Sequence, residues 1–333
     1  MKPLLGDVRE WLTELGLPEP TNILPLQKDL SARTYYRLNL TDVCEWGTSL
    51  VLCVHSGQYE STISDFVSIS KQLKDAGVTA PEVIAQKQHW LLQTDAGSMD
   101  LRQHCLEWLE KGDAQSIEIA YERLLDQLVR LQGISPGHPV SARSFDFDKL
   151  HFEMEHFAQH AAQAGQKFAR EYFFSFEFQM FLKTICEKLA QSTSKVFAHR
   201  DLHSKNVMRS SEDLVWIDFQ DARSGLRYYD LASLLYDPYL PLSRDFRTRM
   251  LSSFSRKSGK AVEENLFYMQ AFQRLVKAIG TYMSVIHSRK DREYLGYLRQ
   301  AAIHLEEVVQ LGGFPDHTFL FVRGMQRFAE LEF

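Results

Sequence analysis

Residues 199–221 constrain this chain more than any other segment, because polar positions alternate in them with short apolar runs. Asp201 follows a histidine and an arginine, and Asn206 comes after four further residues. The apolar run Leu214–Ile217 is typical of a short buried strand, and Asp218 follows it directly. Because ligands often bind where a strand ends, this segment predicts a functional site.

These residue types suit phosphoryl transfer. That reaction needs a carboxylate that orients and deprotonates an acceptor hydroxyl, and metal ions that neutralise phosphate oxygens. Mg²⁺ prefers oxygen ligands such as carboxylates and amides. The spacing matches a kinase catalytic loop and predicts Asp201 as the base, with Asn206 and Asp218 as metal ligands. Each residue alone also fits a turn or a strand end, but the three together favour chemistry.

The chain that follows this segment is too short to bind a peptide substrate. Asp218-Phe219-Gln220-Asp221 stands where protein kinases have Asp-Phe-Gly, and a helix is predicted only a few residues later, near Tyr229. An Ala-Pro-Glu motif is absent from the sequence. We therefore expect a small-molecule kinase.

Length and composition set the remaining bounds. A chain of 333 residues can form two lobes, and its net charge of −5 does not indicate a nucleic-acid or membrane surface. The first residues lack the apolar core of a signal peptide, and the four cysteines are scattered without metal spacing. We expect a cytoplasmic monomer with free thiols that binds a small molecule, not nucleic acid or a membrane.

The N-terminal part predicts a small β-rich lobe. Between two expected strands lies a polar loop without glycine, in which Ser31 and Arg33 could bind phosphate as a glycine-rich loop does. A plain hairpin turn with solvated arginines explains the loop equally well. The apolar run Ser49–Val54 predicts a further strand, which holds Cys53 but no lysine for the nucleotide phosphates.

A polar break near residues 93–98 predicts a hinge, which divides the chain into lobes 1–97 and 98–333. Helical periodicity dominates from Leu101 onward, so the fold class is α+β, with a two-lobed protein-kinase-like architecture. His156 and His160 lie one helical turn apart, but we expect a packing or solvated face there and not a metal site.

Three segments resemble the aminoglycoside phosphotransferase/choline kinase superfamily. Within it they look most like bacterial anomeric N-acetylmuramate/N-acetylglucosamine kinases. The segments are His199–Asn206 with Ile217–Ala222, Asp29–Arg37, and Gln273–Gly280 with its Gln-Arg-x-x-Lys-Ala-x-Gly pattern.

The resemblance implies a kinase that uses ATP and Mg²⁺ and transfers the γ-phosphate to the anomeric hydroxyl of an amino sugar in cell-wall recycling. It implies Asp201 as the base and Asn206 and Asp218 as metal ligands. Residues near the nucleotide would be Ser31 and Arg33 at the phosphates and Gln93 and Asp95 at the hinge. The chain departs from the family at Thr34 and at the hinge, which affects the expected sugar more than the reaction.

Acceptor contacts are expected in the loop that follows the metal aspartate. His203, Asp221 and Arg223 could meet sugar hydroxyls, an acetamido group or a carboxylate. Asp221 could equally hold the loop in place. For Asp230 we expect only this structural role.

Two other functions compete with an amino-sugar kinase. A kinase for an aminoglycoside or choline would need an acidic or aromatic acceptor pocket. A catalytically idle nucleotide-binding protein would explain the missing strand lysine, but not the three intact residues of the predicted site.

Overall fold

The computed structural model describes residues 4–26, 33–55, 59–163, 173, 175–192, 195–210, 213–289, 291 and 293–330. The chain divides into two compact units. Unit 1 comprises residues 1–99 and 208–220, and unit 2 comprises residues 100–207 and 221–333. The short segment 208–220 thus belongs with the N-terminal unit, although the expected division at residues 97/98 assigned it to the C-terminal lobe.

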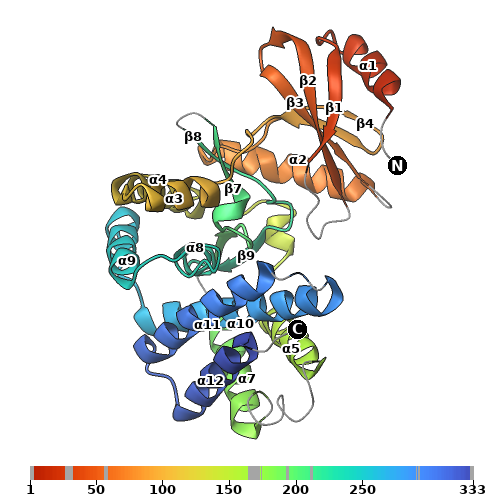
Figure 1. The fold of residues 1–333 in the computed structure, drawn as a ribbon. Helices are drawn as coiled ribbons and strands as arrows, with labels where there is room; N and C mark the ends of the chain where they lie inside the picture. The colour runs from red at the N-terminus through yellow and green to blue at the C-terminus, as the bar shows by residue number, and fades with distance from the viewer. Residues whose placement is uncertain are drawn as a thin grey trace. The chain divides into compact units, whose positions relative to one another are not determined.

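Unit 1 is built on an antiparallel sheet in the order β1-β2-β3-β5-β4 (Figure 1). The strands are Pro20–Pro25 (β1), Thr34–Cys44 (β2), Gly47–Val54 (β3), Val83–Lys87 (β4) and Trp90–Thr94 (β5). Helices α1 (Leu5–Glu14) and α2 (Tyr59–Asp75) accompany the sheet, and β7 (Val207–Ser210) pairs with β8 (Asp213–Trp216).

Alternating apolar residues explain how the sheet of unit 1 packs. Leu50 and Leu52 on β3 join Leu38 on β2 in one buried cluster with Val8 and Leu12 of α1. The hairpin that precedes Asp218 is attached to the same unit by backbone hydrogen bonds, from Trp216 N to Thr79 O at 2.8 Å and from Arg209 N to Met99 O at 3.2 Å. The predicted metal ligand Asp218 is therefore positioned by unit 1.

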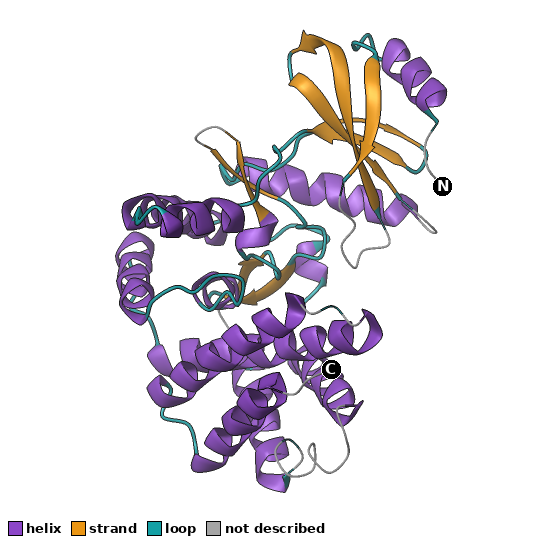
Figure 2. Cartoon of the chain, viewed as in Figure 1, coloured by secondary structure: helices purple, strands orange, loops and turns teal. Residues whose placement is uncertain are grey.

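Unit 2 is mainly helical (Figure 2). Its helices are Leu101–Glu110 (α3), Ala114–Gln132 (α4), Phe147–Gln163 (α5), Phe176–Ala190 (α7), Tyr229–Leu235 (α8), Arg244–Ser258 (α9), Glu264–Arg289 (α10), Glu293–Leu311 (α11) and Asp316–Glu330 (α12). A short ribbon of β6 (Lys195–Ala198) and β9 (Arg223–Leu226) and two 3₁₀ turns, Val140–Ala142 and Ser204–Asn206, complete the unit. The predicted fold class is confirmed.

Helices α5 and α10 pass each other closely because Gly280 lacks a side chain. A Cβ at Gly280 would lie 2.7 Å from Cα of Phe157, closer than two unbonded carbons can approach. The centre of α10 is buried, with Phe272, Val276 and Ile279 all below 1% exposure. This close crossing fixes the position of the polar residues on the same stretch of α10.

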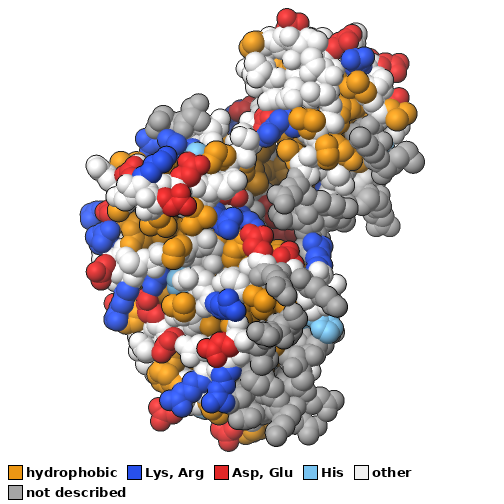
Figure 3. Space-filling view, in the orientation of Figure 1, with side chains coloured by type: hydrophobic (Ala, Val, Ile, Leu, Met, Phe, Trp, Pro, Cys, Tyr) orange, Lys and Arg blue, Asp and Glu red, His pale blue; other side chains and the backbone are white. Residues whose placement is uncertain are grey.

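The outside of the molecule has mixed charge. On the face drawn in Figure 3, acidic and basic side chains are interspersed, as expected for a net charge of −5. No helix in the described ranges is both long and apolar enough to span a bilayer.

Candidate active site

The predicted catalytic loop lies in unit 2 between β6 and the 3₁₀ turn Ser204–Asn206. Two buried carboxylates hold its backbone. Asp230 accepts hydrogen bonds from His199 N at 2.6 Å and Arg200 N at 3.0 Å, and Asp237 accepts one from Ser204 N at 2.8 Å. Burial raises the pKa of both aspartates, while the N–H donors act in the opposite direction. Asp230 therefore has a structural role, but it holds the catalytic loop, whereas we expected it to hold the loop before α8 and to cap that helix.

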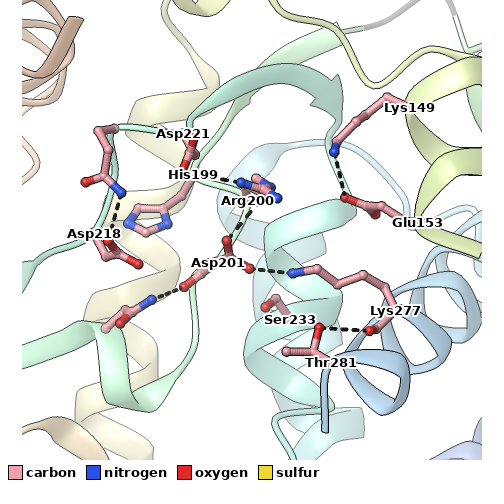
Figure 4. A network of polar contacts seen from close by, with 12 residues as sticks. Lys149, Glu153, His199, Arg200, Asp201, Asp218, Asp221, Ser233, Lys277 and Thr281 are labelled. Atoms are coloured by element: carbon pink, nitrogen blue, oxygen red, sulfur yellow. Dashed lines mark hydrogen bonds and ion pairs between the residues drawn. The ribbon is translucent and has the colours of Figure 1, made fainter. Parts of the chain in front are cut away.

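Asp201 lies among three cations, of which Figure 4 shows Lys277 and Arg200. Its Oδ1 atom is 2.8 Å from Lys277 Nζ and 3.7 Å from Arg274 Nη2, and its Oδ2 atom is 3.9 Å from Arg200 Nε. Burial alone would raise the pKa of the Asp201 carboxyl, but the positive charges of Lys277, Arg274 and Arg200 hold it well below its usual range. Asp201 is therefore ionised throughout the neutral range and can accept a proton or a hydrogen bond.

Lys277 contacts Asp201 closely, although the sequence interpretation assigned it no role. The Gln-Arg-x-x-Lys pattern of α10 places several polar side chains along an otherwise apolar helix. Arg274 donates to Ser233 Oγ at 2.7 Å, and Gln273 donates to Glu153 Oε2 at 2.9 Å. Buried polar side chains on an apolar helix are unusual. The Gln-Arg-x-x-Lys pattern was therefore the sequence feature that could have indicated a functional role for this stretch of α10.

Asn206 and His203 lie in the same loop as Asp201. The amide nitrogen of Asn206 donates to the main-chain oxygen of Asp201 at 2.9 Å and lies 3.4 Å from Nε2 of His203. The main-chain carbonyl of Asp201 can only accept a hydrogen bond, so the side-chain atom of Asn206 that faces it must be the amide nitrogen. The amide oxygen of Asn206 therefore points away from this carbonyl. Burial lowers the pKa of His203 to about 3, so its ring is neutral at physiological pH.

Asp221 and Arg223 follow at the start of β9. Nη1 of Arg200 lies 3.4 Å from Oδ2 of Asp221, and Arg200 adopts a left-handed backbone with φ of 84°. Arg223 pairs with Ala198, the residue directly before the catalytic loop. Unit 2 thus gathers five of the predicted residues around one loop: Asp201, His203, Asn206, Asp221 and Arg223. Their contacts with an acceptor stay a prediction.

Asp218 belongs to unit 1, where it follows β8. It has a left-handed backbone with φ of 63°, a strained conformation that is often found at functional sites. Its Oδ1 atom accepts a hydrogen bond from Gln220 Nε2 at 2.8 Å and lies 3.6 Å from Arg33 Nη2. Phe219 anchors the segment by ring contact with Phe66, with centroids 4.5 Å apart.

Arg33 lies at the start of β2, beside the strand that lacks a lysine. The side chain of Arg33 is only 12% exposed and lies near Cys53, which burial keeps protonated with a pKa raised to about 11. His55 has its pKa lowered to about 4 by burial and by the charge of Arg33. Arg33 is thus a fixed cation beside Asp218.

The other predicted nucleotide residues lie elsewhere in unit 1. Asp95 accepts two hydrogen bonds from Arg37, at 2.6 and 2.9 Å, and a third from Ser49 at 2.8 Å. Gln93 is buried on β5, opposite Val51 of β3. Asp95 therefore has a structural role, while nucleotide contact by either residue stays a prediction. Ser31 lies outside the described residues.

Asn206 in unit 2 and Asp218 in unit 1 are each of a residue type that can bind a hard divalent cation. Asn206 offers an amide oxygen, and Asp218 offers a carboxylate that is 44% exposed. Within the described residues, no group of three or more His, Cys, Asp or Glu side chains is placed to hold a metal ion. Mg²⁺ usually takes only one or two ligands from a protein, while phosphates and waters complete its shell, and the roles of Asn206 and Asp218 as such ligands stay a prediction.

A comparison with protein families assigns these features to a known group. The model of the phosphotransferase enzyme family (APH) matches residues 22–266, which is more than half of the chain and includes the catalytic loop and Asp218. The chain belongs to this family. Membership in the APH family makes it a phosphotransferase of the kinase type, for which ATP is the expected donor.

One relative of this APH chain is the N-acetylmuramate/N-acetylglucosamine kinase of Pseudomonas aeruginosa. The two sequences are 26% identical over 328 residues, which cover 89% of this chain and 88% of the relative. The similarity thus extends through both units.

Solved structures share the fold of this APH chain. Choline kinase from Cryptosporidium parvum aligns with a TM-score of 0.62 and 12% identity, over 95% of this chain and 98% of that one. The ADP-bound aminoglycoside phosphotransferase APH(2'')-Ib aligns with a TM-score of 0.58 and 15% identity, over 96% and 99%. At these identities the similarity establishes the fold and leaves the acceptor open.

Proposed function

We propose that this chain is an ATP-dependent amino-sugar kinase that phosphorylates the anomeric hydroxyl of N-acetylmuramate or N-acetylglucosamine. The observation that carries the kinase reaction is Asp201, a carboxylate kept ionised on a loop that two buried aspartates hold. The amino-sugar acceptor is supported by the relative from Pseudomonas aeruginosa, whose name specifies those sugars. A cytoplasmic location is part of the same proposal.

Asp201 acts as the base in this proposal. It accepts the hydrogen of the acceptor hydroxyl, whose oxygen attacks the γ-phosphorus of ATP while the bond to ADP breaks. His203 is neutral, so it can contact the acceptor as a hydrogen-bond partner without adding charge. Asp221 and Arg223 begin the segment that we assign to acceptor binding.

Arg33 and the predicted metal ligands serve the nucleotide. Arg33 is a fixed cation beside Asp218 and takes the place of the missing strand lysine at the phosphates. Asn206 and Asp218 would hold Mg²⁺, which neutralises phosphate oxygens when it is bound. An Arg33→Ala variant should bind ATP more weakly. Unchanged nucleotide affinity and turnover would contradict this role.

A cationic acceptor fits the described residues less well. Three cations already lie within 4 Å of the Asp201 carboxylate, so an aminoglycoside amine would meet repulsion there. The ammonium of Lys205 also covers the rings of Tyr239 and Tyr297, at 4.9 and 5.2 Å from their centroids. A choline-type cation would have to displace it from these aromatic faces.

The test is turnover with a panel of acceptors. ADP release from ATP and Mg²⁺ is measured with N-acetylmuramate, N-acetylglucosamine, glucose, choline and kanamycin. We expect turnover on the N-acetyl sugars alone and an acid-labile product, as a 1-phosphate would be. Turnover only on kanamycin or choline would replace this proposal with the cationic alternative. ATP binding without any turnover would favour an idle nucleotide-binding protein.

A further inference from the structure

Lys277 makes an ion pair that stability alone does not explain. Its ammonium reaches from α10 and donates to Oδ1 of Asp201 at 2.8 Å, with side-chain exposures of 18% and 24% (Figure 4). Bringing two charges into a partly buried site costs desolvation energy, and an apolar pair of similar size is often as stable. A functional reason for the pair is therefore worth seeking.

The two oxygens of Asp201 have different surroundings. Oδ1 faces two cations, Lys277 at 2.8 Å and Arg274 at 3.7 Å. Within the described part of the chain Oδ2 accepts no hydrogen bond, and Arg200 lies beside it at 3.9 Å. Lys277 thus fixes the rotamer of the carboxylate through one oxygen and leaves the other available to an acceptor hydroxyl.

The support of Lys277 is rigid. Lys277 lies between Gln273, whose side chain is tied to Glu153 of α5, and Gly280, which lets α10 cross the backbone of α5 closely. Glu153 is 4% exposed and also lies 3.9 Å from Lys149. Because two packed helices hold the lysine, its reach to Asp201 is set by the framework of unit 2 and not by a loop.

Charge gives a second reason for this arrangement. Three cations, Lys277, Arg274 and Arg200, surround Asp201, and Arg200 is also paired with Asp221, so three positive and two negative charges leave an excess positive charge of one. Phosphoryl transfer moves negative charge onto oxygens near that point, and fixed positive charges stabilise it there. Lys277 makes the shortest of the three contacts.

We propose that Lys277 is a positioning residue for phosphoryl transfer, which aims Oδ2 of Asp201 at the acceptor hydroxyl by binding Oδ1. This inference rests on the proposed kinase function and deepens it. In the step itself the acceptor proton passes to Oδ2, the acceptor oxygen bonds to the γ-phosphorus, and the bond to ADP breaks. Lys277 remains bound to Oδ1 throughout.

The test compares Lys277→Met with a matched lysine variant. Lys257→Met removes a similar contact in the same unit, between Lys257 Nζ and Asp126 at 2.6 Å, in which the acidic partners Asp126 and Glu122 belong to α4 and not to the catalytic loop. We expect Lys277→Met to lower kcat by roughly 100-fold or more while the KM for ATP changes by less than about threefold. Lys257→Met should keep the wild-type kcat, and Lys277→Arg should restore part of the loss.

Rescue by an added amine separates positioning from a general loss of packing. In Lys277→Ala, ethylamine should restore turnover saturably, because it supplies an ammonium in the space that the side chain vacated. If Lys277→Met does not fold, the alanine variant with and without amine provides the same comparison. A kcat within threefold of wild type in either variant, or a folded alanine variant that amine leaves inactive, would overturn the inference.

The outcomes also separate this inference from the proposed function. A wild-type protein that turns over no acceptor would overturn both. A wild-type protein that phosphorylates a sugar, together with an equally active Lys277→Met variant, would overturn the role of Lys277 alone.

Discussion

Gly280→Ala tests the close crossing of α5 and α10. In an open helix this change stabilises by up to about 1 kcal/mol, because glycine has the lower helix propensity. Here the new Cβ would lie 2.7 Å from Cα and 3.1 Å from N of Phe157, and both atoms belong to the backbone of α5. A backbone cannot rotate away, so the helices must separate by several tenths of an ångström.

The expected cost follows from this geometry. Overpacking a well-filled site typically costs about 1–3 kcal/mol, which exceeds the gain in helix propensity. We therefore expect a net loss of about 1–2 kcal/mol in the free energy of unfolding. Lys277 lies one turn before Gly280, so kcat should fall as well when α10 moves.

Gly296→Ala is the matched control. Gly296 lies on α11 and is exposed, and a Cβ there would meet nothing within 4 Å. This variant should be as stable as the wild type or more stable, by about 0.5 kcal/mol. Thermal denaturation should separate the two variants by several degrees, at about 2–4 °C per kcal/mol. A Gly280→Ala protein with raised Tm and unchanged kcat would refute the reasoning.

Two further predictions concern stability. Burial and the nearby guanidinium of Arg247 lower the pKa of His304 from 6.5 to about 3, so the folded protein favours the neutral ring. The unfolded chain binds a proton at this histidine more readily, so the folded protein loses stability as the pH falls below 6.5. At pH 5 this loss is about 2 kcal/mol, and His304→Gln should flatten the dependence of unfolding free energy on pH by that amount; an unchanged slope would count against it. Arg37→Ala should cost about 2–4 kcal/mol because it leaves Asp95 unpaired in a site that is 9% exposed, whereas Lys74→Ala, at an exposed ion pair, should cost less than about 1 kcal/mol. Equal losses in urea denaturation of these two variants would contradict the assignment.

Local sequence patterns predicted much of this fold. The apolar run Ser49–Val54 correctly indicated a strand of unit 1, and the run Leu214–Ile217 correctly indicated the strand that ends before Asp218. Each run spans only a few residues, so the information that predicts the strand lies within one short segment. The loop that holds Asp201 and Asn206 was predicted equally well, because these two residues lie only a few positions apart in the sequence.

Contacts between distant segments were less accessible. Lys277 meets Asp201 across 76 positions, and nothing in the periodicity of α10 indicates which carboxylate it reaches. Asp95 pairs with Arg37, 58 positions away, and the sequence did not indicate this partner. Such pairs depend on how whole elements pack, which the sequence of one element does not encode.

Asp201→Asn tests the central claim most directly. The change keeps the size of the side chain and its contacts with α10 largely intact but removes the proton acceptor. Single-turnover ADP formation from ATP, Mg²⁺ and N-acetylmuramate should fall by about 10²–10⁴-fold, while nucleotide binding stays within a few-fold of wild type. A variant that keeps wild-type turnover on this sugar would contradict the account.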